Sequence, residues 1–326
     1  MTEIAHYNLL DRIGDGGIGE LYRARDTKIG RTVALKIVSP AISDDPGRLR
    51  RLLQDARLMT VLSHPNIATL WDVGEADGKT YLAYEFAAGR SLREESGGAA
   101  MNPRRALDLA VQIADAVADA HSAGIIHGDL RPDTIIVTAK GNAKVLDFGL
   151  AQWTRGGMLR ASAARNPDAL PPESVSVLAY LSPEQSIGSA VDPRTDVFSI
   201  GTLTYEMVTG KNPFAAATAG ATVMNVIQGK FTPASVANPA SPRELDAILA
   251  HALTPDIAQR QQSAAALAAE LRSVAAILDV RTGDSASPSA ILPIEDAADR
   301  SVSRLLAGFL LAAAVAAAGV WWWLSR

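Results

Sequence analysis

The chain has 326 residues, of which 48% are hydrophobic and 20% are charged, a balance typical of ordered globular proteins. That length is enough for roughly two to three domain-sized cores. The formal net charge of −4 gives no electrostatic reason to expect nucleic acid as a partner. Because the sequence contains no cysteine, disulfides, a cysteine nucleophile and cysteine-ligated zinc are all excluded.

The N-terminal part of the chain begins with a glycine-rich segment. Gly14, Gly16 and Gly19 are followed by a strand-like segment over residues 20–24, which contains Leu21. Glycines at this spacing let backbone N–H groups approach phosphates closely. A dinucleotide site would need a helix that opens on the glycines. A strand at this place favours a hairpin that lies over a nucleotide.

A lysine lies in the next apolar segment. Residues 33–38 (VALKIV) predict a strand that ends before Pro40 and contains Lys36. An isolated lysine of this kind is usually a solvent-facing residue on an edge strand. Beside a glycine-rich hairpin, its flexible cation can instead reach phosphates. Apolar spacing then predicts a helix over residues 49–62 and a strand over residues 79–86.

Helices dominate the rest of the chain, with one small hairpin between them. Apolar residues at helical spacing predict a helix over residues 104–122 that stops at Gly124. Two short apolar segments, residues 134–137 and 143–146, predict strands joined by the turn Lys-Gly-Asn at 140–142. The pattern therefore predicts a small mixed lobe followed by a larger helical lobe.

Two aspartates flank this hairpin. Asp129 lies in the segment HGDLRP, and Asp147 begins the segment DFG eighteen residues later. The hairpin would bring both carboxylates to one edge of the small sheet. One of them could then orient a hydroxyl nucleophile while the other holds Mg²⁺.

In this order and spacing, the motifs resemble those of the bacterial eukaryotic-like (Hanks-type) Ser/Thr protein kinases, over about residues 7–277. The resemblance implies an α+β, bilobal protein-kinase fold, with a β-rich lobe over residues 7–87 and a helical lobe over residues 88–278. It also implies ATP as the nucleotide, with Mg²⁺ or alternatively Mn²⁺. The implied reaction is transfer of the ATP γ-phosphate to Ser/Thr hydroxyls of proteins.

The resemblance gives a role to each matched residue. Asp129 corresponds to the catalytic base, Arg131 and Lys36 to the cations that contact phosphate, and Asp147 to the Mg²⁺ ligand. Glu85 and Ala87 fall in the hinge that holds adenine. The ATP-binding residues implied in this way are Gly14, Gly16, Gly19, Leu21, Ala34, Lys36, Glu85, Ala87 and Ile136.

Three further residues match structural positions of the family. Glu184, in the motif Ser-Pro-Glu that closes the activation segment, is expected to pair with Arg260. Asp196 is expected to brace the catalytic loop from a helix of the larger lobe. Aminoglycoside and choline kinases share the His-Gly-Asp loop but lack these features, which makes a small-molecule phosphotransferase the weaker alternative.

Several matched positions carry residues that depart from the family pattern. Asp55 replaces a glutamate that pairs with Lys36, so the helix must sit closer for the ion pair to form. Thr134 replaces an asparagine that binds Mg²⁺, and its hydroxyl reaches about one bond less far. Val177 replaces a threonine whose hydroxyl bonds the catalytic aspartate, and Gly128 replaces an arginine that grips a phosphorylated activation loop. These changes leave open a pseudokinase that binds nucleotide and acts as a membrane-tethered scaffold.

The C-terminal end of the sequence predicts a membrane anchor. Residues 305–324 form a stretch of twenty residues without a charge, and three tryptophans stand at 321–323. A helix of that length spans roughly 30 Å, the thickness of the hydrocarbon core of a bilayer. We expect a single transmembrane helix here, preceded by a juxtamembrane linker over residues 279–304. A buried helix of a soluble core is the alternative.

The flanking charges and small residues bear on location and partners. Arg300 and Arg304 precede the apolar stretch, and no basic segment leads into an apolar one at the N-terminus. The positive-inside rule then favours a single-pass protein of the cell (inner) membrane whose kinase part is cytoplasmic. The expected partners are protein substrates, the membrane and, through small residues four apart, a second copy in a homodimer.

Overall fold

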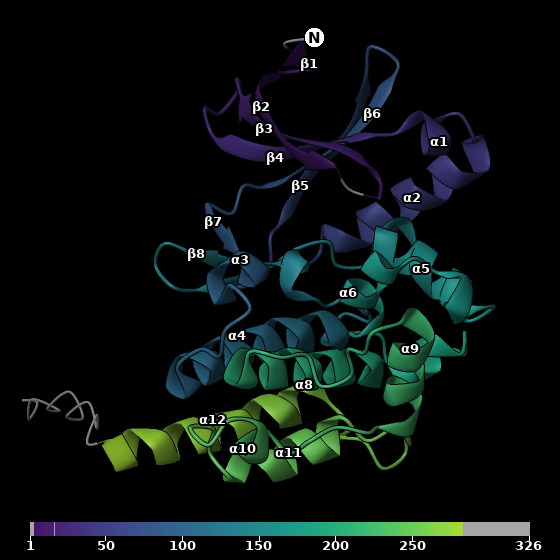
Figure 1. The fold of residues 1–326 in the computed structure, drawn as a ribbon. Coiled ribbons are helices and arrows are strands. Elements are labelled where there is room, and N and C mark those ends of the chain that lie inside the picture. The colour runs from purple at the N-terminus through teal and green to yellow at the C-terminus, as the bar shows by residue number, and fades with distance from the viewer. Residues whose placement is uncertain (1–2, 16, 283–326) are drawn as a thin grey trace, which may run out of the picture. The chain divides into compact units, whose positions relative to one another are not determined.

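The structure, a computed structural model, describes residues 3–15 and 17–282. Met1–Leu278 forms one compact unit with a β-sheet lobe and a helical lobe (Figure 1). Within the described residues, no helix is long and apolar enough to span a membrane. The expected transmembrane helix at 305–324 and most of the expected linker lie outside them.

The small lobe is a six-stranded sheet with the strand order β1-β2-β3-β4-β6-β5. Every neighbouring pair is antiparallel, which the short connections between consecutive strands allow. The sheet confirms the strands expected at residues 20–24, 33–38 and 79–86. Its strands are β1 (Glu3–Ile4), β2 (Tyr7–Asp15), β3 (Gly19–Asp26), β4 (Thr32–Val38), β5 (Leu70–Ala76) and β6 (Lys79–Glu85).

One long helix, α2 (Pro46–Met59), packs against this sheet after the short helix α1 (Pro40–Ser43). Asp45 caps α2 by accepting hydrogen bonds from the backbone N–H groups of Gly47 and Arg48, at 2.8 and 3.1 Å. This cap and Pro46 start the helix three residues earlier than the apolar pattern indicated. Its buried face consists of Leu52, Ala56 and Met59.

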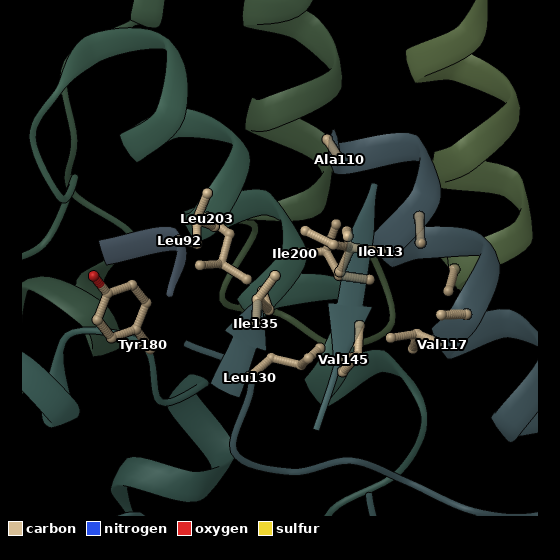
Figure 2. Close-up of a cluster of buried hydrophobic side chains, with 14 of the residues drawn as sticks. Leu92, Ala110, Ile113, Val117, Leu130, Ile135, Val145, Tyr180, Ile200 and Leu203 are labelled. Atoms are coloured by element: carbon tan, nitrogen blue, oxygen red, sulfur yellow. The ribbon is translucent and has the colours of Figure 1, made fainter. Parts of the chain in front are cut away.

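The helical lobe is built on two long helices that pack together, α4 (Pro103–Ser122) and α8 (Arg194–Thr209). Side chains from both helices meet the strands of a small second sheet in one hydrophobic core, as Figure 2 shows for Ile113, Ile200 and Val145. Further helices of the lobe are α3 (Leu92–Ser96), α9 (Ala219–Gln228), α10 (Ala234–Ala237), α11 (Glu244–Ala252) and α12 (Ala264–Thr282).

The second sheet adjoins the loop that carries Asp129. It contains β7 (Gly89–Ser91), β8 (Ile135–Thr138) and β9 (Ala143–Val145), and all pairs are antiparallel. The backbone N–H of Gly141 donates to the carbonyl of Thr138 at 2.8 Å, and Gly141 has a φ of +83°, which favours glycine. The expected hairpin is therefore confirmed, and it brings Asp129 and Asp147 close enough for their charges to interact.

The chain between Asp147 and Asp196 folds into short helical segments. Helices were expected to dominate this part of the chain, but no individual element was predicted in it. Its elements are η2 (Ala151–Trp153), α5 (Arg155–Ala163), η3 (Pro167–Ala169), η4 (Pro172–Ser174), α6 (Val175–Leu178) and α7 (Pro183–Ser186).

Candidate active site

Asp196 of α8 forms hydrogen bonds with the backbone of the loop that carries Asp129. The fully buried carboxylate of Asp196 accepts hydrogen bonds from the backbone N–H groups of His127 and Gly128, both at 2.8 Å. A third contact, also at 2.8 Å, joins it to Nε2 of His121. His127 in turn contacts the carbonyl oxygen of Leu146 through Nε2, at 2.7 Å. The loop is thus fixed to α8 at two backbone N–H groups, in the place that the resemblance implied for Asp196.

Asp129 is a buried carboxylate with one unpaired oxygen. Its residue surface is only 5% exposed, and Oδ2 has no hydrogen-bond partner within the described part of the chain. Burial raises the pKa of Asp129, while the charge of Arg131 and the nearby hydroxyl of Thr154 oppose this rise. A buried acceptor without a donor is costly unless a partner arrives. Oδ2 is therefore ready to accept a hydrogen bond from a hydroxyl group.

Arg131 stands next to this carboxylate but is shared with a second aspartate. Its Nε lies 3.5 Å from Oδ1 of Asp129, and its Nη1 donates to Oδ2 of Asp133 at 2.6 Å. Asp133 also receives a bidentate pair from Arg93 of α3, at 2.7 and 2.8 Å. Burial would raise the pKa of Asp133, but the Arg93 hydrogen bond and the Arg131 charge together lower it. The positive charge of Arg131 is thus partly neutralised within the loop.

Thr134, the expected second metal ligand, is tied into the same loop. It is buried, and its hydroxyl donates to the carbonyl of Arg131 at 2.9 Å. The same oxygen accepts from the backbone N–H of Arg131 at 3.1 Å. To bind a metal ion, the hydroxyl would have to reorganise these bonds.

Lys36 and Asp147 form an ion pair between the two lobes. Lys36 lies on β4, opposite Leu21 of β3, and its ammonium group contacts Oδ1 of Asp147. The ammonium group also lies 5.2 Å from the ring centre of Tyr84 on β6. Asp147 has a φ of +60°, which is uncommon for a residue other than glycine and is often retained at functional sites.

The ion pair between Lys36 and Asp55 is not formed. The carboxylate of Asp55 on α2 instead accepts a hydrogen bond from the indole Nε1 of Trp153 at 2.8 Å, and another from the side-chain amide of Gln152. An aspartate is one methylene shorter than a glutamate, and η2 supplies donors at this distance. The ion pair between Asp55 and Lys36, which the sequence left possible, is therefore absent from the structure, and each side chain has another partner.

The residues expected around ATP lie along the inner strands and the second sheet. Ala34 of β4 pairs with Tyr84 of β6, and Ile136 lies on β8 opposite Ser91. At the end of β6, Glu85 is in an ion pair with Lys144, at 2.6 Å. Ala87 follows Glu85 in the connection to β7, and Gly14 lies opposite Leu21 in the β2–β3 hairpin. Gly16 lies outside the described residues.

Gly19 has a steric reason to be glycine. A Cβ atom on Gly19 would lie 1.9 Å from the carbonyl oxygen of Ile37 on β4. A side chain would therefore force β3 away from β4 at the end of the glycine-rich hairpin. Strand packing thus explains the glycine at position 19, independently of any role in phosphate binding.

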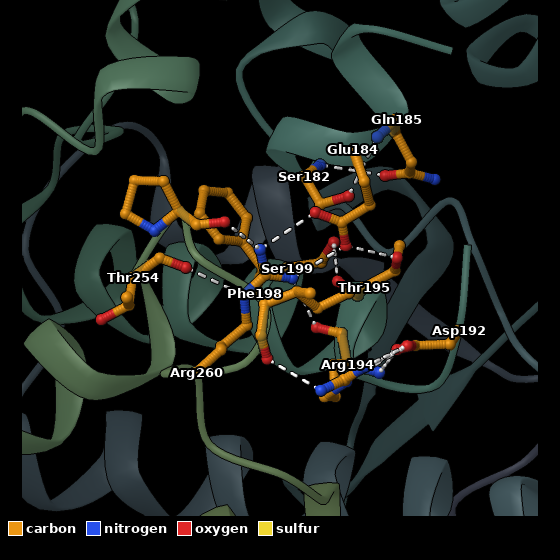
Figure 3. Close-up of polar contacts among 12 residues, drawn as sticks. Ser182, Glu184, Gln185, Asp192, Arg194, Thr195, Phe198, Ser199, Thr254 and Arg260 are labelled. Carbon is orange, nitrogen blue, oxygen red and sulfur yellow. Dashed lines mark hydrogen bonds and ion pairs between the residues drawn. The ribbon is translucent and has the colours of Figure 1, made fainter. Parts of the chain in front are cut away.

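The closing motif is anchored by the pair that the resemblance implied. Arg260 is fully buried and binds Glu184 in a bidentate pair at 2.8 and 2.9 Å (Figure 3). The hydroxyl of Thr195 donates to the same carboxylate at 2.6 Å. Burial would raise the pKa of Glu184, but the hydrogen bonds from Arg260 and Thr195 lower it. The side-chain amide of Gln185 donates to the carbonyl of Gly128 at 2.7 Å, which connects this motif to the loop that carries Asp129.

Some residues of the site carried no motif that would have identified them. Trp153 and Gln152 contact Asp55 across about a hundred residues of sequence, and Arg93 meets Asp133 over forty. Val177 is buried in α6, and a different hydroxyl, that of Thr154, lies beside Asp129. For Gln185 a signal was present, since it follows Ser182 at the spacing of a capping box.

Comparison with known proteins gives several relatives among bacterial kinases. The chain is 35% identical to the probable serine/threonine-protein kinase PknB of Corynebacterium glutamicum, over 81% of this chain and 41% of the relative. It is 30% identical to the serine/threonine-protein kinase PrkC of Bacillus subtilis, over 82% of this chain and 40% of the relative. The chain thus spans about two fifths of the length of these curated relatives.

The fold is also found in a solved structure. The crystal structure of the Mycobacterium tuberculosis PknI kinase domain superposes with a TM-score of 0.64, at 24% identity, and covers 84% of this chain and 97% of that one. The protein kinase domain family matches residues 7–271, which is most of the sequence. The chain therefore belongs to the protein kinase domain family.

Proposed function

We propose that this chain is an ATP-dependent protein kinase that transfers the γ-phosphate of ATP to Ser/Thr hydroxyls of proteins. The observation that carries the proposal is the buried carboxylate of Asp129, with one unpaired oxygen, next to the Lys36–Asp147 ion pair. A base, a phosphate-binding cation and a metal-binding carboxylate are the groups that phosphoryl transfer to a hydroxyl requires. The relatives are themselves named as serine/threonine-protein kinases.

Asp129 has the position and the chemistry of the base. Its unpaired Oδ2 can accept a hydrogen bond from the acceptor hydroxyl, which orients that oxygen toward the phosphate. Burial raises the pKa of Asp129, which makes its carboxylate a better proton acceptor than an exposed aspartate. The backbone N–H groups of His127 and Gly128 donate to Asp196, and these bonds hold the loop that carries Asp129 in place before substrate binds.

The metal-binding group in this proposal is Asp147, with ATP as its second source of ligands. Mg²⁺ is usually bound by one or two carboxylates together with substrate phosphates and water, so a single aspartate fits this ion. Mg²⁺, or Mn²⁺ in its place, neutralises charge on the phosphates when it is bound. In the structure Lys36 is paired with Asp147. A metal ion bound to Asp147 would compete with this pair, so that Lys36 could contact phosphate instead. Within the described residues, no cluster of three or more His, Asp or Glu side chains offers another metal site.

The two alternatives have less support. The pseudokinase interpretation depends on Thr134 and Val177, but Lys36, Asp129 and Asp147 are all present and lie together. A small-molecule phosphotransferase would not need the Glu184–Arg260 pair, which here holds the closing motif. Neither alternative matches the names of the relatives.

We also propose that residues 305–324 anchor the kinase in the cell membrane, with the kinase part on the cytoplasmic side. The support is the uncharged stretch of twenty residues and the arginines that precede it. Protein substrates and a second copy of the chain are the partners that this arrangement would bring together at the membrane. Extraction of the expressed chain with detergent but not with high salt is the expected result, and release by salt alone would contradict the anchor.

Phosphate transfer by the full chain tests the activity. The purified chain is incubated with ATP labelled at the γ-phosphate and a generic basic protein, with Mg²⁺ and Mn²⁺ in separate reactions. Label in the protein is expected, and its absence with both ions would contradict the proposal. Binding is measured separately by the shift in melting temperature that ATP and Mg²⁺ produce. Asp147→Asn should abolish this shift, while Asp119→Asn at an exposed site on α4 should retain it.

A further inference from the structure

Arg93 and Asp133 are brought together by the second sheet. β7 ends at Ser91 and β8 begins at Ile135, and the two strands pair antiparallel with Ser91 opposite Ile136. The chain that leaves β7 and the chain that enters β8 therefore lie next to each other at the same edge of the sheet. Arg93 follows β7, and its Nε and Nη2 donate to the two carboxylate oxygens of Asp133 at 2.7 and 2.8 Å.

The short helix α3 holds Arg93 in this place by contacts of its own. Its N-cap Ser91 and Glu94 form a capping box, in which each side chain accepts a hydrogen bond from the backbone N–H group of the other residue. Leu92 is 1% exposed and belongs to the hydrophobic core shown in Figure 2. Because the cap and the buried leucine fix α3, the helix does not depend on the ion pair with Asp133.

The same carboxylate binds a second guanidinium group, that of Arg131. Oδ2 of Asp133 accepts from Nη1 of Arg131 at 2.6 Å and from Nη2 of Arg93 at 2.8 Å, so two arginines share one oxygen. On its other side, Nε of Arg131 lies 3.5 Å from Oδ1 of Asp129 and forms no hydrogen bond within the part of the chain that the structure describes. Arg131 is therefore held more tightly by Asp133 than by the candidate base.

Arg93 limits the attraction of Asp133 for Arg131. A carboxylate and a guanidinium group pair best through two parallel hydrogen bonds, and Arg93 already binds both oxygens of Asp133 in this way. Arg131 is left with one hydrogen bond to that carboxylate. Without Arg93, Asp133 could form the bidentate pair with Arg131 instead, and the guanidinium group would move away from Asp129.

A surface ion pair without further effect is the simpler explanation of the contact between Arg93 and Asp133. The two side chains are 40% and 36% exposed, and pairs this exposed add little to stability. This explanation omits Arg131, whose side chain is only 18% exposed and stands beside the buried carboxylate of Asp129. One shared oxygen thus connects an exposed ion pair to a buried one at the candidate base.

We propose that Arg93 is a positioning residue of the kinase, which binds Asp133 and thereby keeps the guanidinium group of Arg131 beside Asp129. The inference rests on the proposed phosphate transfer and adds to it a residue from outside the loop. Arg93 acts through Arg131, for which the family resemblance implies a phosphate contact. Because negative charge develops on the phosphate during transfer, displacement of Arg131 should lower kcat more than it weakens the binding of ATP.

The test is a double-mutant cycle on the full chain. Transfer of labelled γ-phosphate to a generic basic protein is measured for wild type, Arg93→Gln, Asp133→Asn and the double variant, and kcat and KM for ATP are determined separately. Arg93→Gln should lower kcat by about tenfold and leave KM within about twofold, because Arg131 is displaced rather than removed. In the Asp133→Asn background the same substitution should have no effect, because the charged competitor for Arg131 is gone.

Two further variants separate positioning from a structural role. Arg93→Lys keeps the positive charge but cannot form a bidentate pair, so its kcat should lie between those of wild type and Arg93→Gln. Arg90→Gln removes a cation from the neighbouring strand β7, where Arg90 donates to the backbone carbonyl of Glu94, and should retain the wild-type kcat. Melting temperatures show that each variant is folded.

The outcomes also separate this inference from the kinase activity itself. Equal kcat values for wild type and Arg93→Gln would overturn the role of Arg93 and leave the kinase activity standing. The same loss of kcat in both backgrounds would contradict an action through Asp133, and a loss that Arg90→Gln shares would reduce the effect to a general change of charge. The absence of label in the reaction with wild type would overturn both proposals.

Discussion

Asp55 of α2 is bound to the indole of Trp153, at 2.8 Å from Nε1, while Lys36 is bound to Asp147. Asp55 and Lys36 therefore do not pair with each other, because each is bound to a different residue. Both partners follow the hairpin β8–β9, so the chain just after β9 controls both contacts. This arrangement leads to the first prediction.

Replacing Trp153 with phenylalanine should raise phosphate transfer to an external protein. Trp153→Phe keeps an aromatic ring but removes the N–H that binds Asp55. A hydrogen bond to a charged group contributes about 1.5–3 kcal/mol, but the amide of Gln152 still donates to Asp55, so the variant releases Asp55 only in part and should raise the rate by up to about tenfold. Trp71→Phe, on β5, is the matched control. Equal rates for wild type and Trp153→Phe would show that this contact does not restrain the enzyme.

Breaking the buried pair between Arg260 and Glu184 should destabilise the large lobe. Arg260→Ala leaves the buried carboxylate of Glu184 without its partner, which costs about 3–5 kcal/mol. The matched control is Arg272→Ala, whose exposed pair with Asp115 should contribute about 0–1 kcal/mol. The free energy of unfolding in denaturant measures both. Similar losses for the two variants would contradict this difference between buried and exposed pairs.

The same pair predicts a pH dependence of stability. The pKa of Glu184 is lowered in the folded chain, so its contribution is fully present above the unfolded pKa of glutamate. That contribution is lost as the pH falls through the lowered value. The difference in unfolding free energy between wild type and Arg260→Ala should therefore shrink on acidification. A difference that grows in acid would contradict the assignment.

The pH at which kcat/KM falls on the acid side of its pH profile should be set by the pKa of Asp129. Because burial raises its pKa, and the base acts only when it is deprotonated, kcat/KM should fall at a higher pH than for an exposed aspartate. Arg131 opposes the rise, so Arg131→Gln should move the limb to still higher pH. Only the pH at which the rate falls is compared between the variants, because the family resemblance also implies a phosphate contact for Arg131 and its loss would change the rate itself. A limb that stays in place, as expected for the control Arg272→Gln, would argue against Asp129 as the base.

Thr134→Asn should strengthen metal binding at the catalytic loop. The asparagine side chain reaches further than the threonine hydroxyl, which is engaged with the backbone of Arg131. We expect the Mg²⁺ concentration needed for half-maximal transfer to fall and the maximal rate to rise. Thr138→Asn, at the far end of β8, provides the control. A lower rate with an unchanged Mg²⁺ requirement would mean that Thr134 serves the loop alone.

The sequence predicted those features that depend on local pattern. A β-rich apolar run indicated the strand at 33–38, and the turn at Gly141 indicated the hairpin between the aspartates. The start of α2 was predicted too late because the N-cap Asp45 and Pro46 were not used as signals. The Glu184–Arg260 pair came from the family resemblance, since 76 residues separate the two side chains.

The contacts that set the state of the site had no such pattern. Whether Asp55 binds Lys36 or Trp153 depends on how the chain folds after Asp147. No motif or spacing in the sequence predicted that local fold. Likewise, nothing local distinguishes Thr154 from other hydroxyl residues nearby, such as Ser162. Its position between Gly17 and Asp129 arises from two lobes that approach each other only in the folded chain.

The measurement that tests the central claim most directly compares two isosteric variants of the full chain. Transfer of labelled γ-phosphate to a generic basic protein is measured for Asp129→Asn and for Asp119→Asn, with melting temperatures to show that both are folded. We predict that Asp129→Asn loses about a hundredfold or more of the wild-type rate, while Asp119→Asn retains it. Equal transfer by the two variants would contradict the assignment of Asp129 as the catalytic base of a protein kinase.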